Sequence, residues 1–383
     1  MSRRTQPIVL QILPHLVTGG VERGTIDIAL ALQSTGAIPI VVSNGGPMVS
    51  ELQQARIEHI TMPVHSKNPL LMQRNTQRLV HLIKERKINI VHARSRAPAW
   101  SAAMAVRRTG IAFLTTFHGT YTLGPFAIKK KYNAIMTCGH RVIAVSRFIA
   151  THVQTVYGLA PERVHVIPRG IDCGLFNSSL VHPNRMLNLA RQWCLPTEHP
   201  LVMLPGRLVR WKGHEILIEA LAKIGRRDLC CLLVGFDQEH VRYRAELEKL
   251  IRYKGLDGMI HWVGYCTDMP AAYMLADVVI SASTEPEAFG RVVVEAQAMG
   301  RPVIATDHGG SCETIVHGKT GCLVPPRDPD ALAQALVDFL DLEAQERHAM
   351  AVRQVAHVHA HFSKEMMCAS TLSVYQDILS STV

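Results

Sequence analysis

Two basic residues follow a short apolar segment in the middle of the chain. The segment 201–206 is typical of a buried strand, and Arg207 and Lys212 come soon after it. A guanidinium fork and an ammonium group are suited to two adjoining phosphates. A basic surface loop is the competing interpretation. Because α/β sheets bind ligands outside the carboxyl ends of their strands, this position favours a phosphate site.

Two carboxylates flank a predicted helix start further along the chain. Segment 278–283 is a predicted strand, Glu287 lies in the loop after it, and Glu295 lies about a turn and a half into a predicted helix, 290–299. The first N–H groups of that helix suit a diphosphate, whereas carboxylates accept hydrogen bonds from sugar and ribose hydroxyls. The alternative is a solvated loop residue and an outward-facing helix residue. The combination of loop, spacing and helix start favours the site.

The N-terminal half carries two weaker signals. Gly19 and Gly20 follow a predicted strand, 8–13, and open a helix, which suits the close approach of an anion but equally an ordinary tight turn. The pattern GxGxxG is absent, which disfavours a dehydrogenase. His118 stands at the end of the predicted strand 112–117, where a ligand is expected.

No metal site is predicted from the histidines or cysteines. His357, His359 and His361 alternate within a helical pattern, where residues two apart point in different directions. The nine cysteines are scattered and never spaced as CxxC, so the sequence suggests neither a disulfide framework nor a zinc site.

Apolar strand-like segments alternate with amphipathic helical stretches throughout, which predicts two α/β domains with parallel sheets. The predicted strands are 8–13, 38–44, 59–64, 88–93, 112–117, 141–146, 164–168, 201–206, 230–235, 259–264, 278–283, 302–306 and 321–324. The predicted helices are 21–35, 75–87, 97–109, 147–157, 214–225, 239–254, 290–299 and 328–341, with a short one near 185–193. Residues 177–200, rich in Asn, Ser and Pro, are the expected linker between domains 1–176 and 201–362. The last helix, within 363–383, is a candidate to pack back on the first domain.

Charge is distributed unevenly along the 383 residues, whose net charge is +10. Residues 1–180 hold 21 Lys and Arg against 7 Asp and Glu, whereas residues 181–383 hold 20 against 24. The basic half indicates an anionic partner, which could be nucleic acid, a membrane face or an acidic lipid. No apolar run approaches the roughly 18 residues that span a bilayer, so we expect a cytosolic protein.

Taken together, these motifs resemble the retaining glycosyltransferases of the GT-B fold known as family four. The resemblance covers nearly the whole chain and includes the downstream segments 302–305, 309–313 and 318–325. It implies two Rossmann-like domains that face each other across a cleft. The N-terminal domain would bind the acceptor and the C-terminal domain a nucleotide-diphosphate sugar, without a metal or another cofactor.

The resemblance also implies a role for each motif residue. Gly19 and Gly20 belong to the loop against the donor diphosphate, and Arg207 and Lys212 neutralise that group in place of a metal ion. His118 lies near the reacting carbon of the sugar. The residues implied to be catalytic are His118, Glu287, Arg207 and Lys212.

Further donor contacts are implied around the two glutamates. Glu287 faces hydroxyls of the donor sugar, and Glu295 holds the ribose hydroxyls. The backbone N–H groups implied to contact sugar and phosphate are those of Phe289, Gly290, Arg291 and Val292. Two features depart from the family pattern. Glu285 offers a second carboxylate beside Glu287, and Arg291 stands where many relatives carry an apolar residue.

A narrower resemblance comes from the segment 91–100, which looks like that of lipopolysaccharide core mannosyltransferases acting on a Kdo–lipid A acceptor. It implies GDP-mannose as the donor and a peripheral position at the cytoplasmic face of the inner membrane, with no nucleic acid involved. The residues implied to meet the anionic acceptor are Arg94, Arg96, Lys129, Lys130 and Lys131. A plain solvated helix start is the competing interpretation of the lysine run.

The sequence thus predicts a retaining, metal-independent hexosyltransferase that builds a bacterial surface glycan, with mannose as the best candidate sugar. Two alternatives stay open at this point. A sugar-nucleotide epimerase of similar fold would consume the donor without an acceptor. A non-catalytic binder of anionic lipid would explain the basic half but not the donor motifs.

Overall fold

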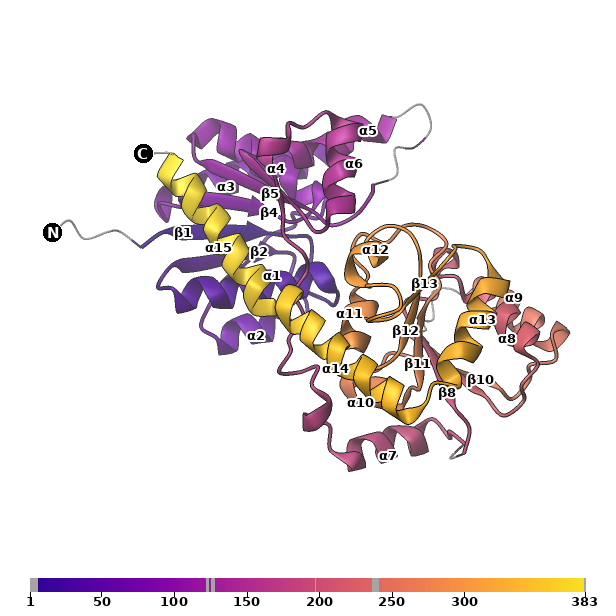
Figure 1. Cartoon of the computed structure of the whole chain (residues 1–383). Coiled ribbons are helices and arrows are strands. Elements are labelled where there is room, and N and C mark those ends of the chain that lie inside the picture. Colours follow the sequence, from indigo (N-terminus) through magenta and orange to yellow (C-terminus); the bar gives the residue numbers. More distant parts are fainter. Residues whose placement is uncertain (1–5, 122–123, 125–127, 197, 236–240, 382–383) are drawn as a thin grey trace. The chain divides into compact units, whose positions relative to one another are not determined.

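The computed structural model describes residues 6–121, 124, 128–196, 198–235 and 241–381. Contacts divide the chain into two units, Met1–Gly170 together with Lys364–Val383, and Ile171–Ser363. Each unit is a parallel β-sheet covered by helices, as the alternation of strand-like and helical segments predicts (Figure 1). No helix in the described part of the chain is both long and apolar enough to cross a membrane.

The first unit has a seven-stranded parallel sheet in the order β3-β2-β1-β4-β5-β6-β7. The strands are short and apolar because helices cover both faces of such a sheet, and most strand residues are buried. The strand bounds are β1 (Ile8–Ile12), β2 (Ile38–Ser43), β3 (Glu58–Thr61), β4 (Ile90–Ala93), β5 (Ala112–Phe117), β6 (Arg141–Ala144) and β7 (Val164–Val166).

Most helices of the first unit connect successive strands, and some of them begin at side-chain caps. The Ser146 side chain accepts a hydrogen bond from the Ile149 amide at the start of α6, and Asn68 caps α3 in the same way ahead of Pro69. The helices are α1 (Gly20–Ser34), α2 (Val49–Gln54), α3 (Pro69–Glu85), α4 (Arg96–Thr109), α5 (Ile128–Asn133), α6 (Arg147–Tyr157) and α15 (Lys364–Ser381).

The last helix, α15, belongs to the first unit although it is the end of the chain (Figure 1). Its buried residues Val374, Tyr375 and Ile378 share a hydrophobic cluster with Val9 and Ile28 of that unit. The Tyr375 hydroxyl lies 2.7 Å from Nδ1 of the buried His92 on β4. Packing and a buried polar contact therefore attach this helix to the first sheet.

The second unit has a six-stranded parallel sheet in the order β10-β9-β8-β11-β12-β13. Its strands are β8 (Leu201–Pro205), β9 (Cys230–Val234), β10 (Ile260–Val263), β11 (Val278–Ser281), β12 (Val303–Thr306) and β13 (Cys322–Val324). Its helices are α7 (Pro183–Gln192), α8 (His214–Ile224), α9 (Val241–Tyr253), α10 (Met269–Leu275), α11 (Arg291–Ala298), α12 (Ser311–Thr314), α13 (Pro329–Leu340) and α14 (Ala344–His361).

Residues 177–200, expected to be a linker, lie within the second unit. The Arg185 guanidinium on α7 forms two hydrogen bonds of 2.6 and 2.8 Å with the Asp268 carboxylate at the start of α10. Phe176 and Val181 join the hydrophobic cluster that also contains Leu201. The division between units therefore falls after Gly170, earlier than the expected boundary at 176.

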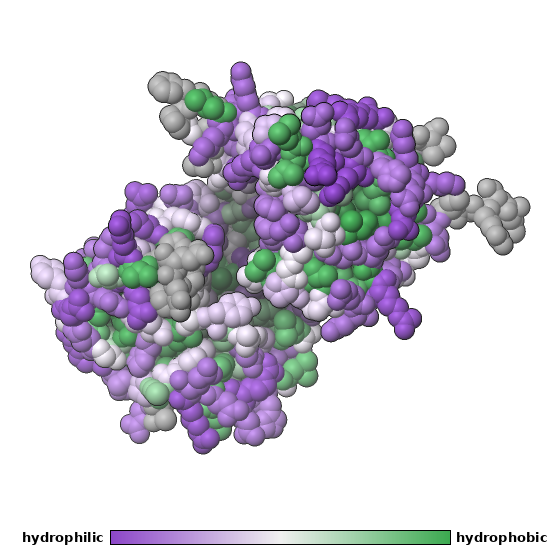
Figure 2. All heavy atoms as spheres, turned by 180° about the vertical axis from the view of Figure 1, so that it is seen from behind, coloured by the Kyte–Doolittle hydropathy of each residue, from purple (hydrophilic) through white to green (hydrophobic). Residues whose placement is uncertain are grey.

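The surface is mixed in character. On the face that Figure 2 shows, hydrophilic and hydrophobic residues are interspersed. Among large apolar side chains, those of Leu70 and Ile128 in the first unit are 77% and 69% exposed. Scattered exposed apolar residues of this kind are normal on a protein surface and need no further explanation.

Candidate active site

In the second unit, the predicted donor residues lie where the strand order reverses. Strands β8 and β11 pair directly at the centre of the sheet, although three α-helices and two strands separate them in sequence. The crossover helices leave these two strands in opposite directions, so the loops after β8 and β11 line a crevice at the carboxyl edge. Lys212 follows β8 and Glu287 follows β11, which brings both side chains to this edge.

Lys212 and Glu287 form a largely buried ion pair at this edge of the sheet. The Lys212 Nζ atom lies 2.7 Å from Glu287 Oε1, and both side chains are only 11–12% exposed. The hydroxyls of Ser281 and Ser283 also donate to Oε1, at 3.2 and 2.5 Å. All three bonds end on the same oxygen, so Oε2 is the carboxylate atom left without a partner in the described part of the chain.

The backbone around Lys212 fixes this pair. Gly213 has φ 74° and lies so close to the second loop that a Cβ there would be 1.8 Å from the Ala282 carbonyl oxygen. The Thr284 amide donates to the Trp211 carbonyl over 2.7 Å, and the Trp211 ring centre lies 4.7 Å from Lys212 Nζ. Because the two loops bind each other by backbone contacts, the ammonium group has little freedom to leave the site.

The electrostatics of the pair keep Glu287 charged. Burial alone would raise the pKa of its carboxyl, but the Lys212 charge and the bonds from Lys212, Ser283 and Ser281 outweigh burial, and the pKa lies below its usual value. Glu287 is thus a carboxylate at neutral pH. This arrangement can accept hydrogen bonds from hydroxyls and place a positive charge beside them.

The start of α11 offers a second polar group. Gly290 caps the helix with φ 82°. The backbone N–H groups of Phe289, Gly290, Arg291 and Val292 donate to no partner in the described residues. Unpaired amides at a helix start, together with the helix dipole, are suited to an anion. This segment begins two residues after Glu287, and the Gly310 amide holds the loop by donating to the Glu287 carbonyl over 2.8 Å.

Glu295 lies inside α11 and is 9% exposed. The Tyr273 hydroxyl donates to its Oε2 over 2.9 Å, and Arg291 Nη2 donates to its Oε1 over 2.8 Å. Tyr273 itself is fully buried on α10. The carboxylate is therefore held on both oxygens, and it is not the outward-facing residue of the alternative interpretation.

The remaining predicted donor residues of this unit are less constrained. Arg207 is exposed, and no ion pair or hydrogen bond of its side chain is found in the described part of the chain. Glu285 is also exposed, and unlike Glu287 it has no contact with Lys212. The structure thus distinguishes the two neighbouring carboxylates that the sequence left as alternatives, because only Glu287 meets the lysine.

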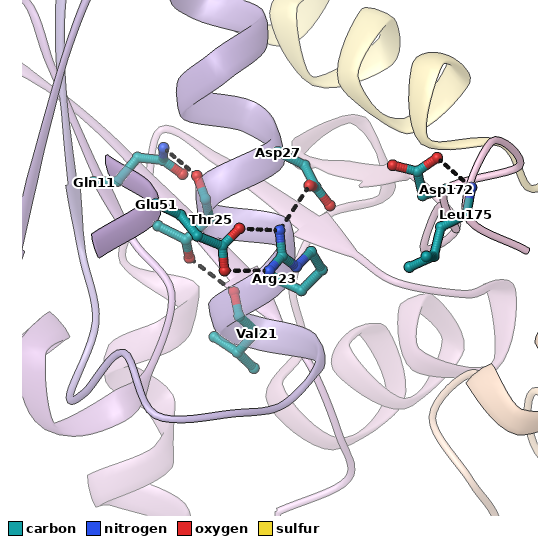
Figure 3. Close-up of polar contacts among 8 residues, drawn as sticks. All are labelled: Gln11, Val21, Arg23, Thr25, Asp27, Glu51, Asp172 and Leu175. Atoms are coloured by element: carbon teal, nitrogen blue, oxygen red, sulfur yellow. Dashed lines mark hydrogen bonds and ion pairs between the residues drawn. The ribbon is translucent and has the colours of Figure 1, made fainter. Parts of the chain in front are cut away.

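In the first unit, Gly19 caps α1 with φ 130° and Gly20 is the first residue of that helix. Figure 3 shows how the helix start is secured. The Arg23 guanidinium forms two hydrogen bonds of 2.6 and 2.7 Å with the Glu51 carboxylate of α2, and the Gln11 side chain donates to the Thr25 carbonyl over 3.0 Å. The glycine turn is thus attached to both β1 and α2.

His118 follows β5, and its Nε2 atom is buried without a hydrogen-bond partner in the described residues. Burial lowers the pKa of its imidazole well below the usual value, and the charges of Arg169 and Arg94 lower it further. The ring is therefore neutral at physiological pH. A neutral imidazole can accept a hydrogen bond from a hydroxyl group or donate one to it.

The five residues expected to meet an anionic acceptor lie in three different environments. Arg94 is 1% exposed, its Nη1 donates to Gln11 over 3.1 Å, and its Nε has no partner in the described residues. Arg96 donates to Asn133 over 2.8 Å and lies 4.1 Å from the Tyr121 ring centre. The exposed residues of the set are Lys129, Lys130 and Lys131 on α5.

Sequence reasoning missed three further groups at these sites. Tyr273, which binds Glu295, gave no signal because a hydroxyl partner on a separate helix has no fixed spacing. Ser281 and Ser283 lie within a predicted strand and look like ordinary strand residues. Arg169 lines one small pocket of the first unit with His92, Arg94 and Thr116, and only its position after a strand could have drawn attention to it.

Among the described residues, no group of three or more His, Cys, Asp or Glu side chains could hold a metal ion. His357 and His361, four residues apart on α14, have ring centres 5.0 Å apart and pack against Phe362. Burial lowers the pKa of His357, and the His361 charge contributes to the same shift. The two rings thus contact each other and Phe362 at the end of α14, where His357 is half-buried and His361 is exposed.

Comparison with known proteins places this geometry in a family. Residues 188–354 match the family described as glycosyl transferases group 1, and residues 18–175 match glycosyltransferase family 4. A glycosyltransferase structure from Rickettsia africae is 39% identical, covers 98% of this chain and 99% of its own, and has a TM-score of 0.90. The Anabaena protein HepE, solved with UDP-glucose, is 25% identical with a TM-score of 0.82, over 96% of this chain and 99% of its own.

A curated relative points the same way. A GDP-mannose-dependent alpha-(1-6)-phosphatidylinositol monomannoside mannosyltransferase from Mycobacterium tuberculosis is 31% identical over 277 residues, which are 69% of each chain. For several other curated relatives, the match spans only 54–60% of their length. The family matches, the extent of these likenesses and the two parallel sheets show that this chain belongs to the group 1 glycosyltransferases of the GT-B fold.

Proposed function

We propose that this protein transfers a hexose from a nucleotide-diphosphate sugar to a bacterial surface glycan, with retention of anomeric configuration and without a metal ion. The observation that carries the proposal is the group of four amides at the start of α11, unpaired within the described residues, beside the Lys212–Glu287 pair. Unpaired amides suit a diphosphate, and the carboxylate suits the hydroxyls of the attached sugar.

The catalytic effect would come mainly from stabilising the leaving group. As the bond from sugar to diphosphate breaks, negative charge grows on the phosphate oxygen. Lys212, Arg207 and the α11 amides would stabilise this charge without rearrangement, which lowers the barrier by electrostatic preorganisation. Retention follows if the acceptor attacks from the face that the diphosphate leaves, with the departing phosphate taking the acceptor's proton. Neutral His118 would position a sugar hydroxyl by hydrogen bonding.

GDP-mannose is our proposed donor. Its support is the relative from Mycobacterium tuberculosis, which is described as GDP-mannose-dependent and matches over 277 residues. The HepE structure contains UDP-glucose instead, so UDP-glucose is the donor to compare directly. These two donors differ in nucleobase, and a binding experiment distinguishes the nucleobases most easily.

An anionic glycolipid of the lipopolysaccharide core is our proposed acceptor, reached at the cytoplasmic face of the inner membrane. The chain has no Asp or Glu between Glu85 and Glu162, whereas this stretch contains eleven Lys and Arg. Lys129, Lys130 and Lys131 are exposed within it. Exposed lysines of this kind are attracted to anionic lipids over a range set by the ionic strength.

The proposal is tested by a thermal-shift panel of GDP-mannose, UDP-glucose, GDP and UDP in buffer containing EDTA, followed by assays of sugar transfer. A donor at 100 times its dissociation constant adds about 2.7 kcal/mol of stability. We expect GDP-mannose to stabilise the protein and to be consumed only when a core glycolipid is added.

Three results would contradict the proposal in different ways. Stabilisation by UDP-glucose but not by GDP-mannose would reject the mannose donor and leave the transfer reaction in place. Conversion of the donor to an epimer or to free sugar without acceptor would instead favour the epimerase alternative. A strict requirement for a divalent cation would reject the metal-independent mechanism.

A further inference from the structure

Arg291 occupies a position that helix energetics disfavour. It is the first residue of α11, where the helix dipole presents partial positive charge and a cation is unfavourable. It forms an ion pair with Glu295, with the cation on the N-terminal side, which is the weaker orientation for residues four apart. The energetics of the helix start thus disfavour an arginine here, and exceptions of this kind are typical of functional positions.

The guanidinium group of Arg291 also uses few of its hydrogen-bond donors within the described residues. Arg291 has five N–H donors, but in the described residues it makes a single hydrogen bond, from Nη2 to Glu295 Oε1. Its Nε atom is buried and has no hydrogen-bond partner in the part of the chain that the structure describes. The side chain as a whole is 30% exposed, so the group is neither fully solvated nor fully bonded. An additional acceptor beside it would improve its bonding.

We propose that Arg291 is a phosphate-binding residue of the donor site, and that it turns from Glu295 towards the phosphates when a nucleoside diphosphate binds. Long side chains on helices normally lean back towards the N-terminus, and from this position that direction leads to the unpaired amides of residues 289–292. The inference rests on the proposed function, because it assumes that a diphosphate lies at this helix start.

The same movement would prepare Glu295 for the ribose. When Arg291 leaves, Oε1 of Glu295 loses its only donor in the described residues, and a ribose hydroxyl can replace it. The Tyr273 hydroxyl stays on Oε2, so the carboxylate keeps its orientation. Recognition of phosphate and recognition of ribose would thereby be coupled through one ion pair.

A double-mutant cycle separates phosphate binding from the positioning of Glu295. Calorimetry measures the affinity for GDP and for UDP of wild type, Arg291→Leu, Glu295→Gln and the double variant. A charge-assisted hydrogen bond corresponds to about a tenfold change in affinity or more. We expect Arg291→Leu to weaken binding of the preferred diphosphate at least about tenfold in both backgrounds, and Arg291→Lys to fall between wild type and leucine.

Two results would overturn the inference. Wild-type affinity of Arg291→Leu would show that the guanidinium does not bind phosphate. An effect of Arg291→Leu that disappears in the Glu295→Gln background would show that Arg291 acts only by holding Glu295. Arg252→Leu, which removes an exposed cation from α9, is the matched control and should bind as wild type.

Failure of the proposed function looks different in the same experiment. If neither GDP nor UDP binds the wild type, or if Lys212→Ala leaves binding unchanged, the phosphate site itself is wrong. If Lys212→Ala weakens binding whereas Arg291→Leu does not, the site stands and only the role of Arg291 is rejected.

Discussion

At the scale of single residues, the site combines groups that the sequence identifies with contacts that it does not contain. Residue types and spacing indicated Lys212, Glu287 and Glu295, because basic residues and carboxylates follow apolar segments at predicted strand ends. The sequence did not predict that Lys212 pairs with Glu287 across 75 residues, or that Tyr273 binds Glu295. Such partners depend on which strands become neighbours, and no local spacing encodes that.

The Lys212–Glu287 pair predicts a pH dependence of stability. The folded pKa of Glu287 lies below its unfolded value, so the stabilising contribution is complete above the unfolded pKa and is lost as pH falls through the folded one. Glu287→Gln leaves the largely buried Lys212 without its carboxylate partner. We expect this to lower the free energy of unfolding by about 3 kcal/mol at pH 7. Urea unfolding should show this difference from wild type shrinking between about pH 5 and pH 3.

Glu285→Gln is the control for this measurement, since it removes an exposed carboxylate two residues away. It should change stability by less than about 0.5 kcal/mol at either pH. A difference between wild type and Glu287→Gln that stays constant down to pH 3 would contradict a charged, lysine-bound Glu287.

At the scale of elements, the sequence predicted each strand of the two sheets to within a few residues. Buried parallel strands are short apolar runs, so they are recognisable without a partner. It missed α2, α5, α10 and α12, which have at most seven residues and too few turns for a helical period. It also gave no bounds for α14, although it recognised a helical pattern around His357. Residues 177–200 looked like a linker because they are polar, but the Arg185–Asp268 contact that attaches them to the second unit joins distant positions.

Two glycines at opposite ends of α8 provide a matched test of how Lys212 is positioned. Gly213 and Gly225 have similar φ angles, 74° and 71°, but a Cβ on Gly213 would collide with the Ala282 carbonyl, whereas one on Gly225 meets no atom within 4 Å. Gly225→Ala should lower the free energy of unfolding, measured with urea, by about 1–2 kcal/mol. This is the usual cost of placing alanine in the left-handed backbone conformation. Gly213→Ala should cost at least about 4 kcal/mol. Equal costs would contradict the close contact of the two loops.

The attachment of α15 to the first unit can be tested at Tyr375. Tyr375→Phe removes the hydroxyl that meets His92 Nδ1 and leaves a fully buried nitrogen without this partner. We expect a loss of about 1–3 kcal/mol in the free energy of unfolding. Tyr253→Phe, at a residue that is 84% exposed, should be neutral. Wild-type stability of Tyr375→Phe would show that the apolar packing of α15 suffices without this bond.

At the scale of the whole molecule, the uneven distribution of charge can be read directly from the sequence, but local structure does not explain it. The N-terminal 180 residues carry a surplus of 14 positive charges, from 21 basic and 7 acidic residues, but no step of folding requires it. We expect the protein to bind vesicles containing phosphatidylglycerol and not neutral vesicles, with binding lost as salt rises. Replacing Lys129, Lys130 and Lys131 by alanine should weaken binding by about 3 kcal/mol.

Vesicle flotation with a charge-matched control decides whether that surface is specific. Replacing Lys249, Arg252 and Lys254 of the second unit by alanine removes the same number of charges. We expect this variant to float with anionic vesicles as the wild type does. Equal losses in both triple variants would mean that net charge alone attracts the protein to lipid.

The central claim is that the second unit holds a pyrophosphate against the α11 amides and Lys212. Its most direct test is a calorimetric titration of the wild type, Lys212→Ala and Lys223→Ala with GDP and UDP in EDTA. Lys223 is the control, because it lies on α8 of the same unit and forms an exposed ion pair with Asp330 of α13. We predict that Lys212→Ala weakens the preferred diphosphate at least about tenfold, and that Lys223→Ala binds as the wild type does. Wild-type affinity in Lys212→Ala would contradict the account.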